Sequence, residues 1–230
     1  MSTKPFSIAI DGPAGAGKST VAKALAAELK AMYLDTGAMY RAFGLYILRR
    51  GAANDTKAII AALDDVDIAV KFVDGAQHIF LGDEDVTDAI RAPEVSMAAS
   101  DVSAVPEVRE RMVALQRKIA EGQSVVMDGR DIGTKVLPNA TLKIYMTASA
   151  EERARRRCLE LEQKGKPEPY EKVLREMQER DYQDTHRAAS PLCAAPDAVT
   201  VDTTHLSFDE GVAEIKRLAL EAIGNQEGKS

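Results

Sequence analysis

An eight-residue segment near the N-terminus combines the residue types and the spacing that bind polyphosphates. Residues 12–19 read Gly-Pro-Ala-Gly-Ala-Gly-Lys-Ser and match the pattern GxxxxGK[ST]. The segment follows an apolar stretch, Phe6–Ile10, and precedes a run with helical spacing, which is the strand–loop–helix context that the pattern requires. Glycines let backbone N–H groups approach phosphate oxygens, and the N-terminus of the helix adds partial positive charge.

This loop predicts a site for ATP and Mg²⁺. Lys18 is expected to reach the β- and γ-phosphates, and the Ser19 hydroxyl is expected to bind Mg²⁺. A switch GTPase would also need an NKxD segment and a DxxG segment, and neither string occurs. The residues expected to bind ATP from this loop are Gly12, Pro13, Ala14, Gly15, Ala16, Gly17, Lys18, Ser19 and Thr20.

Arginines are the second chemical feature of the chain. The planar guanidinium group pairs well with phosphate, so several arginines indicate an enzyme that holds phosphates on two substrates. A single arginine such as Arg155 is more simply a solvated surface residue. The segment 149–167, rich in arginine, is interpreted as a mobile helical lid. The candidate arginines are Arg41, Arg109, Arg130, Arg153, Arg155, Arg156, Arg157, Arg180 and Arg187.

The elements that must position these residues alternate between strands and helices. Such alternation predicts an α/β fold, a parallel sheet with helices on both faces. Ser149 and Glu152 have the spacing of a capping box at the start of one helix. The sequence predicts core strands over 6–10, 124–127, 142–146 and 198–201. It predicts helices over 19–32, from the segment 35–41 to about 50, over 106–121, from 149 to about 164, over 170–182 and over 208–223.

A different pattern interrupts this alternation. Apolar residues recur every second position over 66–72, Asp74-Gly75 has the composition of a turn, and short strand-like runs follow at 77–81 and 85–87. This predicts a small antiparallel sheet inserted into one domain. We expect the core to comprise 1–62 and 103–230, and the insert to comprise about 63–102.

Composition excludes several other classes of protein. The chain has 230 residues, 45% of them hydrophobic, which is enough for a globular core. A net charge of −6 disfavours binding of nucleic acid through a basic surface. No membrane span or secretory leader is recognisable, and the two cysteines form no metal-binding pattern. We expect a cytoplasmic monomer that acts on small molecules.

Four segments together resemble the bacterial-type cytidylate (CMP) kinases. They are residues 10–19, then 34–41 (Leu-Asp-Thr-Gly-Ala-Met-Tyr-Arg), then 128–134 (Asp-Gly-Arg-Asp-Ile-Gly-Thr), and Glu179-Arg180-Asp181 through Arg187. The similarity runs over nearly the whole chain in the same order and includes the inserted sheet. It implies a P-loop nucleoside monophosphate kinase fold and transfer of the ATP γ-phosphoryl group to CMP or dCMP.

The resemblance also implies roles for individual residues. Arg157 is the lid arginine expected to close over ATP, and Lys18, Arg130, Arg157 and Arg187 form the expected catalytic set. The residues that correspond to CMP-binding positions are Thr36, Arg41, Ser100, Arg109, Arg130, Asp131, Arg180, Asp184 and Arg187. Within that set the cytosine would be read by Ser100, Arg109 and Asp131, and the sugar by Arg180 and Asp184.

Several alternatives stay open on the sequence alone. Asp128 is a candidate to support Mg²⁺ indirectly or merely to cap a turn, whereas Asp11 is interpreted as structural. Tyr33, Tyr40 and Tyr46 are interpreted as packing residues. A P-loop kinase for another small acceptor such as UMP, or a regulatory module that binds ATP without transfer, would share the loop.

Overall fold

The computed structural model describes residues 4–53, 55–73 and 76–228, which fall into two compact units. The first unit joins the two ends of the chain, Met1–Tyr33 and Gly122–Ser230, and the second is the segment between them, Leu34–Glu121. None of the helices described has the length and the apolar character that crossing a membrane demands.

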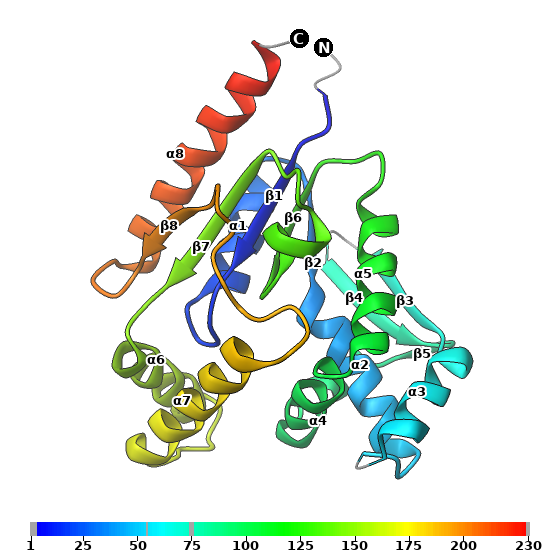
Figure 1. Ribbon diagram of the computed structural model, residues 1–230. Coiled ribbons are helices and arrows are strands. Elements are labelled where there is room, and N and C mark those ends of the chain that lie inside the picture. Colours follow the sequence, from blue (N-terminus) through cyan, green and yellow to red (C-terminus); the bar gives the residue numbers. More distant parts are fainter. Residues whose placement is uncertain (1–3, 54, 74–75, 229–230) are drawn as a thin grey trace. The chain divides into compact units, whose positions relative to one another are not determined.

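The first unit is built on a five-stranded sheet (Figure 1), with the strand order β2-β6-β1-β7-β8. The pairings β1–β6, β1–β7 and β7–β8 are parallel, which confirms the predicted α/β class. All five residues of β6 are buried, as expected for a central strand of a parallel sheet. The strands are β1 (Ser7–Asp11), β2 (Met32–Asp35), β6 (Val125–Gly129), β7 (Leu142–Thr147) and β8 (Val199–Asp202).

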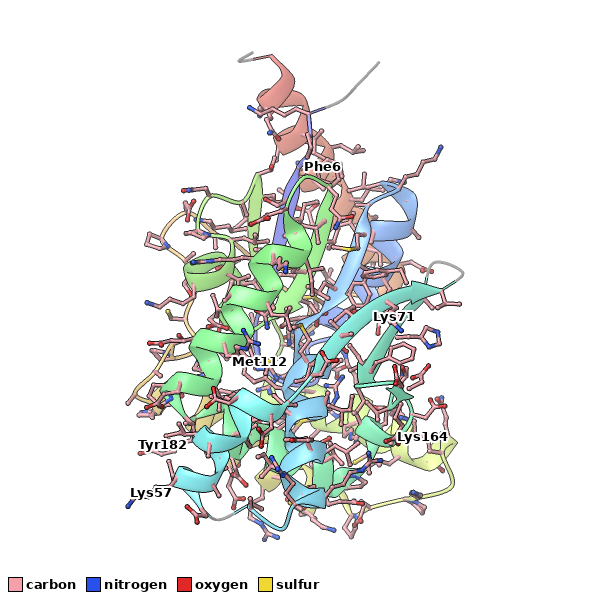
Figure 2. The ribbon with its side chains drawn as sticks, turned by 90° about the vertical axis from the view of Figure 1, so that its right-hand side faces the viewer. Phe6, Lys57, Lys71, Met112, Lys164 and Tyr182 are labelled. Atoms are coloured by element: carbon pink, nitrogen blue, oxygen red, sulfur yellow. The ribbon has the colours of Figure 1, made fainter. Side chains whose placement is uncertain are left out.

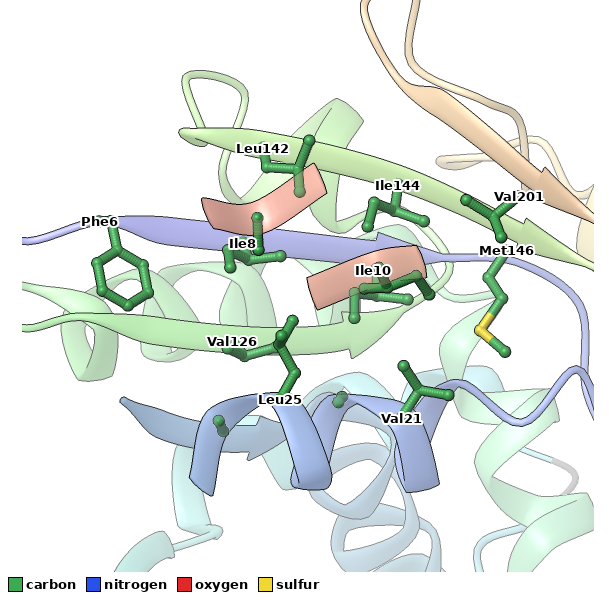
Figure 3. Packing of buried hydrophobic residues seen from close by; sticks show 14 residues of the cluster. Phe6, Ile8, Ile10, Val21, Leu25, Val126, Leu142, Ile144, Met146 and Val201 are labelled. Carbon is green, nitrogen blue, oxygen red and sulfur yellow. The ribbon is translucent and has the colours of Figure 1, made fainter. Parts of the chain in front are cut away.

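Two helices cover one face of this sheet. Ile8, Ile10 and Ile144 project from neighbouring strands toward Val21 and Leu25 of helix α1, Lys18–Glu28 (Figure 3). Helix α8, Phe208–Glu227, adds further apolar side chains to the same cluster. The short helix η2, Ile132–Val136, contacts β1 and β6 and is tied to the side chain of Asp11, which faces away from this cluster.

Helices α6 (Ala150–Gln163) and α7 (Tyr170–His186) form a hairpin in the first unit. Ala154, Val173 and Met177 make its small core, and Gly165, with a φ of 68°, ends the first helix as predicted. The predicted capping box at Ser149 is only half formed. The Ser149 hydroxyl accepts the Glu152 N–H, but the Glu152 carboxylate pairs with arginines of its own helix.

The second unit combines four α-helices and one short 3-10 helix with the small antiparallel sheet that the sequence predicts. Its sheet has the order β3-β4-β5, with β3 at Ile68–Val73, β4 at Ala76–Leu81 and β5 at Glu84–Asp85. On one face of this sheet Lys71, labelled in Figure 2, lies 4.2 Å from the centre of the Phe80 ring. The predicted turn at Asp74-Gly75 lies outside the described residues.

Three of the helices of the second unit (α4, α5 and η1) pack against α2, Thr36–Arg49, whereas α3 packs against α5. Helix α4 approaches α2 so closely at Gly44 that an added Cβ atom would lie 2.9 Å from the Ala99 nitrogen. Only the first and last helices of this unit were expected, because the sequence analysis proposed no helix for the segments now seen as α3 and α4. The helices are α2 (Thr36–Arg49), α3 (Thr56–Asp65), η1 (Ala89–Arg91), α4 (Pro93–Ser103) and α5 (Pro106–Ala120).

Three predicted helix ends differ from the structure. Helices α7 and α8 extend to His186 and Glu227, beyond the predicted ends at 182 and 223. The apolar spacing suggested a helix over 19–32, but α1 ends at Glu28. Lys30 adopts a φ of 52°, which no α-helix contains, and the Met32 N–H donates to the Ser124 carbonyl at 2.9 Å. The chain therefore leaves the helix and enters β2 at Met32, where a tertiary pairing outweighs helix propensity.

Candidate active site

The phosphate-binding loop lies between β1 and α1, at the carboxyl end of the central strand. Gly12 has a φ of 149°, and an added Cβ atom there would lie 1.9 Å from the Met146 carbonyl oxygen on β7. No other residue type fits this position without moving the sheet. Gly15 and Gly17 also have positive φ, at 75° and 88°, so the loop has the unusual backbone that anion-binding loops need.

Lys18 is the first residue of α1 and is buried, with 5% of its surface exposed. Its Nζ donates to the Pro13 carbonyl of the same loop at 2.6 Å. Burial, followed by the nearby positive charge of Arg130, lowers the Lys18 pKa to about 7, against the opposing pull of Asp128 and Asp11. The ammonium group is therefore held in a setting that a polyphosphate would stabilise.

Asp128, the penultimate residue of β6, receives two hydroxyl hydrogen bonds. Ser19 donates to one carboxylate oxygen at 2.8 Å, and Tyr33 donates to the other at 2.8 Å. A hydroxyl beside a carboxylate is an oxygen donor set of the kind that Mg²⁺ prefers when phosphate oxygens complete its shell. The described residues contain no group of three or more His, Cys, Asp or Glu side chains arranged for a metal.

Three predicted substrate residues meet around Asp184, which is 7% exposed on α7. Arg130 donates from Nε to Asp184 at 2.8 Å, and Arg187 lies 3.7 Å from its other oxygen. Burial would raise the pKa of Asp184, but Arg130, Arg180 and Arg187 hold it below its usual value. The cluster thus carries a surplus of positive charge, as an anion site requires.

Two further aspartates lie buried beside this cluster. Asp11 accepts the backbone N–H groups of Ile132 and Gly133, each at 2.7 Å, and burial raises its pKa to about 6. These contacts agree with the structural role expected of Asp11. Asp131, 4% exposed, precedes η2 without capping it through its side chain, and its charge contributes to the raised pKa of Asp11.

In the second unit, Arg41 and Thr36 lie in the first two turns of α2. Asp35 caps this helix by accepting the Ala38 N–H at 2.9 Å, and its other oxygen accepts from Arg41 at 2.8 Å. Thr36 is the first residue of the helix and is buried. The motif Leu34–Arg41 therefore folds so that its arginine pairs with Asp35, the residue that caps the same helix.

Arg109 and Ser100 are both linked to Ser103 within the second unit. Arg109 is 4% exposed, donates to the Ser103 carbonyl at 3.2 Å, and has its guanidinium carbon 5.5 Å from the centre of the Tyr40 ring. The Ser103 hydroxyl donates to the Ser100 carbonyl at 2.8 Å. Tyr40 thus supports an arginine through its ring, a contact that the sequence analysis did not anticipate.

The arginines of the lid segment, residues 149–167, are paired with carboxylates. Arg155 and Arg156 contact Glu152, and Arg157 donates to Glu160 at 2.7 Å. Arg157, the lid arginine favoured from the sequence, is 42% exposed in its side chain and lies within α6 beside that partner. The carboxylates of Glu152 and Glu160 therefore compensate the charge of these three arginines.

Comparison with known proteins places the chain in a family. A family model described as cytidylate kinase matches residues 8–221. The chain belongs to the cytidylate kinase family. A cytidylate kinase of Caldicellulosiruptor bescii is 52% identical over 224 residues, which are 97% of this chain and 99% of that protein. A cytidylate kinase of Streptococcus sanguinis is 50% identical over 222 residues, 96% of this chain and 99% of that one.

Likeness to a solved structure is much weaker. A gluconokinase structure from Sinorhizobium meliloti aligns with a TM-score of 0.46 at 17% identity, covering 96% of this chain and 93% of that one. A match of this quality carries no argument about the site. Membership of the cytidylate kinase family rests on the sequence relatives.

Within this member of the cytidylate kinase family, the predicted residues group by unit. Lys18, Asp128, Arg130, Asp184 and Arg187 gather in the first unit, whereas Thr36, Arg41, Ser100 and Arg109 belong to the second. Tyr33 packs against the core of the first unit, as the sequence analysis expected, but its hydroxyl bond to Asp128 was not expected. The signal available in the sequence was its position in the strand that follows α1 along the chain.

Proposed function

We propose that the chain transfers the γ-phosphoryl group of ATP to CMP or dCMP, giving ADP and CDP or dCDP. The observation that carries the proposal is the buried Lys18 beside the Arg130–Asp184–Arg187 cluster. Cations at a phosphate-binding loop together with several arginines suit two phosphorylated substrates better than one. The names of the relatives support CMP as the acceptor.

The reaction needs no general base from the protein. A nucleoside monophosphate has its second pKa near 6, so the attacking oxygen is already anionic at pH 7. The protein's task is to align two phosphates and to neutralise charge as the phosphoryl group moves. Lys18 and the loop N–H groups would hold the ATP phosphates, and Arg130 and Arg187 would hold the acceptor phosphate.

Mg²⁺ would be held by Ser19, with Asp128 fixing the orientation of that hydroxyl. When bound, the ion neutralises phosphate charge and orients the β- and γ-oxygens. Tyr33, through its bond to Asp128, would keep the carboxylate turned toward Ser19. We further propose a monomer acting in the cytoplasm in pyrimidine nucleotide metabolism.

Choice of base would fall to Ser100, Arg109 and Asp131, by the family resemblance. Cytosine offers an amino group at N4 and acceptors at N3 and O2, so it suits a carboxylate beside an arginine. UMP would set O4 against the Asp131 carboxylate and N3–H against Arg109. Each unpaired group in a desolvated site costs about 1–3 kcal/mol, so kcat/KM should favour CMP over UMP by roughly a hundredfold.

The test is a product-resolved assay of ATP with CMP, dCMP, UMP and AMP, run on the wild type and on Asp131→Ala. The wild type should phosphorylate CMP or dCMP best, and the variant should lose CMP turnover much more than UMP turnover. Equal use of UMP and CMP by the wild type would favour a broader P-loop kinase. ATP binding without transfer to any acceptor would favour a regulatory module.

A further inference from the structure

Arg153 differs from the other arginines of the lid segment, because it is buried and hydrogen-bonded to protein groups. It lies in the first turn of α6 with only 4% of its surface exposed. Its Nε donates to the Ala148 carbonyl at 2.9 Å, and its two Nη atoms form a bidentate pair with Asp181 of α7 at 3.1 and 2.6 Å. Nη1 also donates to the carbonyl of Ala14 at 3.0 Å.

These contacts occupy most of the guanidinium group. Arginine carries five N–H donors, and the four hydrogen bonds leave one of them. The Asp181 carboxylate also compensates the charge, with their closest atoms 2.6 Å apart. A group so fully engaged by protein atoms is poorly suited to bind phosphate directly, but it is well suited to fix the segments that it joins.

One of those segments is the phosphate-binding loop itself. Ala14 is the third residue of that loop, and the next residue, Gly15, lies directly against the α6–α7 hairpin. A Cβ atom added at Gly15 would lie 2.9 Å from Met177 Cε and 3.3 Å from Arg153 Cβ. The base of the hairpin therefore supports the loop from outside.

The planarity of the peptide bond gives this support a consequence for ATP. In a trans peptide the C=O of one residue and the N–H of the next point in opposite directions. An Ala14 carbonyl held toward Arg153 therefore fixes the Gly15 N–H in the opposite direction, away from the guanidinium group. Loops of this kind bind phosphate through such N–H groups, so the direction of the Ala14–Gly15 peptide bears on affinity for ATP.

We propose that Arg153 and Asp181 form a positioning pair that sets the geometry of the phosphate-binding loop for the ATP polyphosphate. Asp181 orients the guanidinium group of Arg153, and the hydrogen bond from Arg153 to the Ala14 carbonyl fixes the direction of the Ala14–Gly15 peptide. This inference deepens the proposed kinase function, because it assigns to that same loop two residues whose own contacts are with protein atoms. Asp181 thereby gains a role that the motif Glu179-Arg180-Asp181 did not reveal.

The experiment compares Arg153→Lys and Asp181→Asn with a matched control, Arg155→Ala. Arg155 lies on the same helix, is 66% exposed in its side chain and contacts Glu152. Measurements are KM and kcat for ATP and CMP, calorimetric binding of ATP and of inorganic tripolyphosphate, and the thermal midpoint. Small displacements of binding groups cost up to about a hundredfold in rate, so the KM for ATP should rise about tenfold in Arg153→Lys and about threefold in Asp181→Asn.

The remaining values should stay close to those of the wild type. The KM for CMP should change less than about twofold, and Arg155→Ala should match the wild type throughout. Binding of tripolyphosphate should weaken by the same factor as binding of ATP, because the loop contacts only the phosphates. The double variant should be no worse than Arg153→Lys alone, since the two residues act as one unit.

Three outcomes would overturn the proposal. A lower thermal midpoint with an unchanged KM for ATP would show a purely structural pair. Weaker ATP binding with unchanged tripolyphosphate binding would mean that Arg153 contacts the nucleoside. If Arg153→Lys does not fold, an unchanged KM for ATP in Asp181→Asn would overturn the proposed positioning pair. If no acceptor is phosphorylated, the proposed kinase function is wrong. The calorimetric binding of ATP and of tripolyphosphate still tests the role of the Arg153–Asp181 pair in that case.

Discussion

The two units of the molecule hold their candidate substrate residues in different ways. In the first unit Lys18 is 5% exposed, and burial together with the surrounding charges lowers its pKa, while the neighbouring arginines lower the pKa of Asp184 against the effect of burial. In the second unit Arg41 retains 28% of its side-chain exposure and rests on the helix cap Asp35. The first arrangement is built into the core around the phosphate-binding loop, whereas the second is a local ion pair on one helix.

This difference indicates where free energy is stored before substrates bind. Keeping a lysine buried beside an arginine is unfavourable, and a bound polyphosphate relieves it. A partly exposed ion pair contributes only about 0–1 kcal/mol, so Arg41 can exchange Asp35 for a phosphate at little cost. We therefore expect the loop to act in the transition state and the second-unit arginine to act mainly in binding.

The largest effect should come from Lys18→Ala. Loss of the ammonium group removes stabilisation of the charge that develops in the transition state, so kcat with ATP and CMP should fall at least roughly a hundredfold. Lys57→Ala is a suitable control, because Lys57 is exposed on α3, as Figure 2 shows, and should keep wild-type rates. A folded Lys18→Ala protein with normal kcat would contradict the assignment of the loop.

The pH dependence of ATP binding should be the next largest effect. The Lys18 pKa is lowered to about 7 in the free protein, and a bound polyphosphate favours the protonated form. Above pH 7 the free lysine is increasingly neutral, so ATP binding must take up a proton and weakens as pH rises. Between pH 7 and 8.5 affinity should fall about tenfold, at 1.36 kcal/mol per pKa unit.

Calorimetry in two buffers of different ionisation enthalpy measures this proton uptake directly. Close to one proton should be taken up per ATP at pH 8.5, and the uptake should disappear in Lys18→Arg, which stays charged throughout this range. Proton uptake that persists in Lys18→Arg would assign the titration to another group.

Local sequence was sufficient for the parts of the fold that depend on a few adjacent residues. The phosphate-binding loop lies within eight consecutive positions, and its glycines have the positive φ values that the pattern implies. Strands β1, β6 and β7 are largely apolar, so their type follows from the sequence, whereas their order in the sheet was not predicted. The small antiparallel sheet follows from alternation of apolar residues in the same way.

Partners distant in the sequence could not be predicted from it. The contact between Tyr33 and Asp128 joins residues 95 positions apart, and Arg153 and Asp181 are 28 apart. Nothing in the local pattern distinguishes Arg153 from its neighbour Arg155, yet one is buried against the loop and the other is exposed. The capping box at Ser149 formed only in half for a local reason, because Glu152 had arginine partners one turn ahead.

Arg41→Ala sharpens the contrast between the units. It should raise the KM for CMP about tenfold, since hydrogen bonds to charged groups are worth about 1.5–3 kcal/mol and the Asp35 contact is lost in the free protein. The KM for ATP should change less than about twofold. Arg49→Ala on the same helix, where Arg49 pairs with Glu84 on the surface, is the matched control and should alter neither value. An equal rise in the KM for ATP and the KM for CMP would contradict the expectation that Arg41 on α2 serves CMP alone.

The smallest effect should be seen in the lid segment, residues 149–167. Arg157, the expected lid arginine, already contacts Glu160, and α6 is already helical, so substrate binding need only exchange a partly exposed ion-pair partner for phosphate oxygens. Amide hydrogen exchange should slow by about threefold to tenfold when ATP and CMP analogues bind together, since ordering of a preformed helix adds little protection. The slowing should be greatest near Gly165, where the helix ends.

The C-terminal half of α8 serves as the internal reference, because it lies far along the chain from the loop and should not respond. Equal exchange in 149–167 with and without the analogues would show that this hairpin is a fixed support of the loop and not a lid.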